Sequence, residues 1–161
     1  MTRTGGSILG IDLGTRRVGV ALAELDGLAA RPLSTIGLPG RDPEADRARA
    51  MAAIEALVQE QGAVELVVGL PLEANGDQGP MAEAAREFAA ALGSRLGLPV
   101  TLRDERLSSH LAESRLGPMP RGRAGGPPSR TQRGRYRARV DREAATIILQ
   151  DELDARRSAS R

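Results

Sequence analysis

The stretch Ile8-Leu9-Gly10-Ile11-Asp12-Leu13-Gly14-Thr15 decides how the fold is interpreted, because an apolar run ends there on a carboxylate. A run of this kind is typical of a fully buried strand. Burying a lone ionised carboxylate is costly unless a cation or hydrogen-bond donors compensate it. Asp12 is therefore a candidate metal ligand or phosphate-site residue. A turn in which Asp12 accepts hydrogen bonds from nearby backbone amides explains the same residue equally well.

The length and composition predict one domain. A chain of 161 residues is long enough to bury a sizeable single core, and we expect the domain to span residues 1–157 with a disordered tail over 158–161. Cysteine is absent, which excludes disulfides, thiolate metal sites and cysteine nucleophiles. No secretory segment or 18-residue apolar run occurs, so we expect a cytoplasmic protein with no membrane partner.

The positive charge is unevenly distributed along the chain. All 23 basic residues are arginine, and residues 115–142 carry nine of them against the single acid Asp141. We expect residues 117–138, which are also rich in Gly and Pro, to form a mobile loop. Arginine-rich segments attract polyanions, and the planar guanidinium suits phosphate. The alternative is a solvated loop whose arginines have no ligand.

The periodicity of apolar residues predicts a mixed five-stranded sheet flanked by helices, in the order βββαβαβαα. Turn residues and alternating apolar positions indicate a three-stranded meander at the start, and later strands alternate with helices, which implies parallel pairing. The expected strands are 7–12, 17–23, 28–36, 64–70 and 99–103, and the expected helices are 43–61, 80–96, 107–116 and 139–156.

Two further carboxylates fall where they can approach Asp12. Glu105 and Asp104 follow the fifth expected strand, and sites in open α/β sheets lie beyond the carboxyl ends of parallel strands. Asp141 shares a helix face with Ala145 and Ile148, which should pack on the sheet. Ordinary capping and helix-dipole effects explain each acid singly.

Convergent carboxylates repel one another, and a divalent cation relieves that repulsion. Hard oxygen ligands suit Mg²⁺ or Mn²⁺. Two such ions can clamp a phosphodiester during in-line displacement. The acids therefore indicate metal-dependent phosphoryl chemistry.

Four blocks in order resemble the YqgF-type (RuvX-like) family of the RNase H-like superfamily, known as pre-16S rRNA nucleases or Holliday junction resolvase-like proteins. The resemblance spans about residues 7–153. One departure is that Glu73 and Asn75 stand in a loop where the family usually has Asn and Asp. The blocks are Gly10-Ile11-Asp12-Leu13-Gly14-Thr15-Arg16-Arg17-Val18-Gly19-Val20-Ala21, Val68-Gly69-Leu70-Pro71-Leu72 with Gly76 and Gly79-Pro80, Asp104-Glu105-Arg106-Leu107-Ser108-Ser109, and Val140-Asp141 with Ala144-Ala145 and Ile148-Leu149-Gln150.

The resemblance implies an RNase H-like fold and a nuclease centre in which Asp12, Glu105 and Asp141 are the catalytic and metal-binding residues. The implied reaction is phosphodiester hydrolysis, with Mg²⁺ or Mn²⁺, in processing the 5′ end of pre-16S rRNA. The expected partner is structured RNA, or branched DNA if the protein resolves Holliday junctions. Seven arginines are expected to bind nucleic acid: Arg16, Arg17, Arg106, Arg133, Arg135, Arg137 and Arg139.

Several alternatives stay open at this point. A non-catalytic nucleic-acid-binding domain would keep the acids without cutting. The Asp-x-Gly-Thr hairpin also resembles the phosphate hairpin of actin-like and sugar-kinase ATPases, although those need two such domains. We expect a monomer, whereas a dimer would suit junction cutting because that reaction needs two symmetry-related sites.

Overall fold

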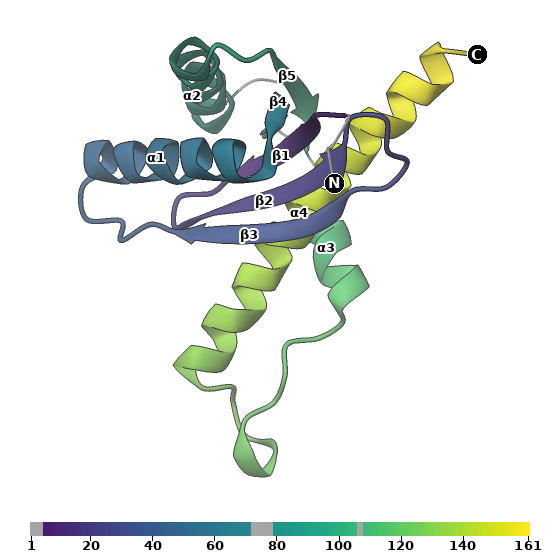
Figure 1. Cartoon of the computed structure of the whole chain (residues 1–161). Coiled ribbons are helices and arrows are strands. Elements are labelled where there is room, and N and C mark those ends of the chain that lie inside the picture. The colour runs from purple at the N-terminus through teal and green to yellow at the C-terminus, as the bar shows by residue number, and fades with distance from the viewer. Residues whose placement is uncertain (1–4, 72–78, 106–107) are drawn as a thin grey trace.

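A computed structural model describes residues 5–71, 79–105 and 108–161. Its centre is one five-stranded sheet in the order β3-β2-β1-β4-β5 (Figure 1). Strand β1 pairs with β2 antiparallel and with β4 parallel, β2 pairs with β3 antiparallel, and β4 pairs with β5 parallel. The mixed sheet predicted from the sequence is confirmed. The strands are β1 Ser7–Leu13, β2 Arg17–Glu24, β3 Arg31–Gly37, β4 Ala63–Leu70 and β5 Val100–Asp104.

Helices cover both faces of the sheet. Helices α1 (Pro43–Gln61) and α2 (Pro80–Leu96) pack on one face, against a core that includes Leu9 and Ile11 of β1. Helix α4 (Arg130–Ala159) crosses the other face, where it contacts all five strands and packs on Ile8. Alternate β1 residues therefore face opposite layers, which places Asp12 on the α4 side, as expected for a strand.

The helix ends follow the turn chemistry in the sequence. Asp42 caps α1 by accepting hydrogen bonds from the amides of Glu44 (3.0 Å) and Ala45 (3.3 Å). Gly62 and Gly97 end α1 and α2 in the left-handed region, with φ of 63° and 64°, where glycine meets no steric penalty. These helix boundaries are confirmed.

The expectation of a mobile loop over 117–138 is wrong for its second half, because α4 begins at Arg130. Ser129 and Gln132 form a capping box: the Gln132 amide donates to Ser129 Oγ at 3.1 Å, and the Ser129 amide donates to Gln132 Oε1 at 2.7 Å. Tyr136 and Val140 continue the helical spacing and pack with α3 (Ser108–Leu116). The helix also runs to Ala159, so the disordered tail expected over 158–161 is wrong for its first two residues.

Within the described part of the chain, no helix is long and apolar enough to cross a membrane.

Candidate active site

Asp12 lies near the carboxyl end of β1, the central strand of the sheet. Burial raises the pKa of Asp12 above its ordinary value, and the charge of Asp141 raises it further, whereas a hydrogen bond with Glu105 lowers it. Asp12 and Glu105 are therefore close neighbours. The sequence-based expectation that Asp12 and Glu105 meet is therefore supported by their contact.

Glu105 follows β5 directly and its side chain lies over Gly69 of β4. The Glu105 amide donates to Leu70 O at 3.2 Å, and its carbonyl accepts from Ser108 Oγ at 2.9 Å. A Cβ at Gly69 would overlap Glu105 Oε2, so only glycine leaves room for this carboxyl group. Glycine inside a strand often marks a close approach of this kind.

The pKa values of both acids of the pair are raised. Burial, the charge of Asp12 and the hydrogen bond to Asp12 raise the pKa of Glu105 to about 10, and Asp104 contributes through its charge. Burial and the neighbouring acids therefore favour the protonated form of Glu105 in the metal-free protein. Glu105 Oε2 is buried and has no hydrogen-bond partner among the described residues. The pair thus has an acceptor oxygen that the described residues do not satisfy.

Asp141 reaches the site from α4. It lies over β2, whereas Glu105 lies over β4, so the two acids flank Asp12. Gly19 of β2, which pairs with Asp12 in the sheet register, lies directly under the Asp141 carbonyl, and a Cβ there would collide with it. Arg17 Nε lies 2.5 Å from Asp141 Oδ2, with the two side chains 29% and 23% exposed. In contrast to Asp12 and Glu105, Asp141 is thus neutralised by a cation of the chain.

The three acids suit a hard divalent cation by chemistry, although they do not yet converge. Oxygen donors are the ligands that Mg²⁺ and Mn²⁺ prefer. The unsatisfied Oε2 of Glu105 is one such donor. In the residues that the structure describes, no three acidic or histidine side chains stand close enough to hold a metal. The Asp141 carboxylate is instead paired with Arg17.

The predicted arginines fall into three groups. Arg17 is at the site, and the neighbouring Arg16 is exposed on the β1–β2 turn with its side chain against Gly40. Arg106, like Glu73, lies outside the described residues. The remaining four are exposed on the first turns of α4, not on a loop: Arg133, Arg135, Arg137 and Arg139.

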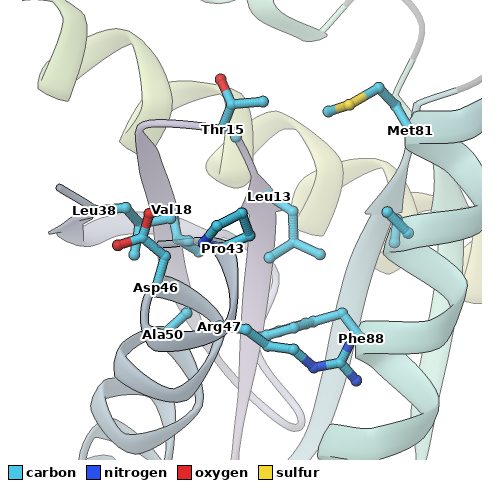
Figure 2. A pocket seen from close by; sticks show the side chains of 13 residues that line it. Leu13, Thr15, Val18, Leu38, Pro43, Asp46, Arg47, Ala50, Met81 and Phe88 are labelled. Atoms are coloured by element: carbon cyan, nitrogen blue, oxygen red, sulfur yellow. The ribbon is translucent and has the colours of Figure 1, made fainter. Parts of the chain in front are cut away.

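A separate cavity of about 250 Å³ lies on the other face of the sheet, between α1, α2 and the end of β1 (Figure 2). Leu13, Met81 and Phe88 give it an apolar lining. Its charged residues are engaged locally: Asp46 accepts from the Gly40 amide at 2.8 Å, and the Arg47 guanidinium lies 6.0 Å from the centre of the Phe88 ring. The cavity is therefore not an extension of the acidic site.

Sequence reasoning missed the glycines that let α4 approach the sheet. Gly10, Gly19 and Gly69 all sit inside strands under α4 or Glu105. A Cβ at Gly10 would come within 2.7 Å of Leu149 Cβ. Glycine within a strand pattern was the available signal. Together with the acids, the three glycines define where the helix crosses.

A mixed sheet with two antiparallel and two parallel pairings, acids at the end of its central strand and a long helix across it define an RNase H-like α/β domain. The RuvC protein of Thermus thermophilus, solved in complex with a Holliday junction substrate, has this fold. Its TM-score to this chain is 0.57 at 16% sequence identity, with 95% of this chain and 96% of that chain covered. The predicted fold class is confirmed.

The chain belongs to the family described as "RuvX: Holliday junction resolvase", whose model matches residues 6–155. A "Putative pre-16S rRNA nuclease" of Chloroflexus aurantiacus is 46% identical over 154 residues, which is 94% of this chain and 88% of that protein. A protein of the same name from Anaeromyxobacter dehalogenans is 45% identical over 148 residues, 92% of this chain and 96% of the relative. The resemblance to the YqgF-type (RuvX-like) nucleases is confirmed.

Proposed function

We propose that this protein is a metal-dependent endonuclease that hydrolyses phosphodiester bonds of structured RNA in processing the 5′ end of pre-16S rRNA. The observation that carries the proposal is the half-buried Asp12–Glu105 pair with its buried, unpartnered Oε2, beside Asp141. Relatives named as pre-16S rRNA nucleases support the substrate. A cytoplasmic location is part of the same proposal.

Asp12, Glu105 and Asp141 would hold the cations, Mg²⁺ or Mn²⁺. When bound, such ions activate water and stabilise the leaving oxygen. Glu105 would have to be deprotonated to act as a ligand, because its raised pKa favours the protonated form without a metal. Asp141 must separate from Arg17, and the freed guanidinium is then beside the site, where it can bind a substrate phosphate. Two internal contacts would thus be replaced on binding. The Asp12–Glu105 contact would give way to contacts with metal, and the Arg17–Asp141 ion pair to contacts with metal and substrate.

Holliday junction resolution is the second candidate, because the family description names it and the RuvC structure holds such a junction. The two reactions need the same acids but differ in assembly. Cutting a junction symmetrically requires two sites related by a two-fold axis, so it requires a dimer, whereas a monomer is sufficient for RNA processing. We propose the monomer.

The test is cleavage of a labelled pre-16S 5′ leader and of a four-way DNA junction by the wild type and by Asp12→Asn, with Mg²⁺, Mn²⁺ or EDTA. Asp151→Asn is the matched control, because Asp151 is exposed on α4. We expect metal-dependent cutting of the RNA by the wild type and the control alone. Cutting of only the junction would replace the proposal by the resolvase reaction. Binding of nucleic acid without cutting would indicate a non-catalytic domain.

A further inference from the structure

The first turns of α4 form an arm that extends past the β3 edge of the sheet (Figure 1). Ala138 is where the helix leaves the sheet, because its carbonyl accepts a hydrogen bond from Thr35 Oγ1 of β3 at 2.7 Å. Helix α3 supports the arm on one side, through packing of Ala112 and Leu116 near Tyr136. Tyr136 Oη also donates to Gly117 O at 2.7 Å. The arm, residues 130–140, is therefore a helix held in place by contacts with β3 and α3.

The arm carries positive charge that the protein does not neutralise. Two nearby acids on α4 are already engaged, Asp141 with Arg17 and Glu143 with Arg115. Four exposed arginines make no ion pair or hydrogen bond with any part of the chain that the structure describes. Uncompensated guanidinium groups concentrated in this way attract polyanions. The four are Arg130, Arg135, Arg137 and Arg139.

The helical repeat sorts these arginines into two rows. At 3.6 residues per turn, Arg130 and Arg137 lie on one side of the arm, and Arg135 and Arg139 lie about 170° away on the other. Asp141 follows Arg137 by four positions, about 6 Å along the axis, and shares its side. We name these the near row (Arg130, Arg137), which leads to the acidic site, and the far row (Arg135, Arg139).

The side of the arm between the two rows, opposite α3, has only small residues. Thr131 and Gly134 are exposed there, and Ala138 is half-buried. A Cβ added at Gly134 would have no other heavy atom within 4 Å. A ligand can therefore approach the helix backbone closely, with guanidinium groups on both sides of it.

We propose that the arm docks between the two phosphate backbones of a double-stranded segment of nucleic acid, the near row on the strand that is cut and the far row on its complement. This inference rests on the proposed function and names the substrate as paired, not single-stranded. An α-helix is 10–12 Å across with its side chains, so arginines on opposite sides can reach two flanking backbones at once. A single strand offers one backbone and can engage only one row.

The test compares two charge-matched double variants, Arg130→Gln with Arg137→Gln and Arg135→Gln with Arg139→Gln. Arg95→Gln is the control, because Arg95 pairs with Glu55 on the opposite layer. Binding is measured by fluorescence anisotropy in EDTA over a range of salt, with a short RNA duplex, the same duplex in DNA and one strand alone. We expect each double variant to reduce the slope of log affinity against log salt by about 2 for DNA duplex, since each lost phosphate contact removes about 0.9. On the single strand, we expect only one double variant to have an effect.

The two-backbone arrangement would be overturned if only one of the double variants, or neither, changed the salt slope of duplex binding. A third variant, Gly134→Gln, adds bulk to the open side without touching either row, and we expect it to weaken duplex binding several-fold with helix content retained. Because binding is measured without metal, the result is separate from cleavage. If duplex binding depends on both rows but no nucleic acid is cut, only the proposed nuclease function is rejected. If Asp12-dependent cleavage is observed but the salt slopes of both double variants equal that of the wild type, only this inference is rejected. Failure to bind any of the three probes would reject it as well.

Discussion

Arg17 and Asp141 form an ion pair across 124 positions of sequence, with Nε and Oδ2 2.5 Å apart at the edge of the acidic site. The pair joins the start of β2 to α4 and neutralises Asp141, which lies outside the Asp12–Glu105 pair. A cation that uses Asp141 as a ligand must compete with this guanidinium.

Replacing Arg17 by Gln should therefore raise the affinity for Mg²⁺ or Mn²⁺. Partly exposed ion pairs contribute about 0.2–1 kcal/mol, so we expect up to about a fivefold lower Kd by isothermal titration calorimetry. Arg95→Gln removes the same charge far from the acids and should leave the Kd unchanged. Weaker metal binding by Arg17→Gln would mean that Arg17 positions Asp141 for the cation instead of competing for it.

The stability of the metal-free protein should fall as pH rises. The pKa of Glu105 is about 10 in the folded state against 4.5 unfolded, so the folded state holds one more proton between these values. Stability then declines through that interval. In EDTA at pH 8, Glu105→Gln should be more stable than the wild type and should melt several degrees higher, because the neutral amide has no proton to lose.

Thermal melts at several pH values check this prediction. The melting temperature of Glu105→Gln should depend less on pH than that of the wild type, and Glu113→Gln, on the exposed side of α3, serves as the matched control. Parallel pH profiles for the wild type and Glu105→Gln would contradict the protonated pair.

Gly19→Ala should displace α4 from the sheet. A Cβ at this position collides with the Asp141 backbone carbonyl, and overpacking of this kind costs about 1–3 kcal/mol. We expect a lower free energy of unfolding together with lost cleavage, because Asp141 moves with the helix. Gly37→Ala is the control, since its Cβ meets no heavy atom within 4 Å. Equal stability of the two variants in urea unfolding would show that α4 does not rest on Gly19.

Gly134→Ala should stabilise the protein by about 0.5–1 kcal/mol, because glycine within a helix is unfavourable relative to alanine. Urea unfolding and far-ultraviolet circular dichroism measure the effect. Gly117→Ala should do the opposite, since Gly117 has φ of 76°. A destabilised Gly134→Ala would contradict a helix that begins at Arg130.

The sheet and its acids could be predicted because their signals are local. Apolar runs that end at Asp12 and before Glu105 predicted the strands. Because the carboxyl ends of parallel strands meet at one edge of a sheet, they also predicted that the two acids lie at the same edge. The first turns of α4 were missed because the density of Arg, Gly and Pro outweighed the Ser129–Gln132 capping box and the spacing of Tyr136 and Val140. The ion pair between Arg17 and Asp141 could not be predicted, since it joins segments that are distant in the sequence.

The crossing of α4 over every strand also has a consequence for the order in which the protein is made. Asp12 is translated in the first strand, whereas Asp141 and the helix that covers β1 come near the end of synthesis. A nascent chain therefore exposes the apolar α4 side of its sheet and lacks the third acid until translation is almost finished. Prematurely terminated chains that lack Asp141 therefore cannot assemble the full acidic site.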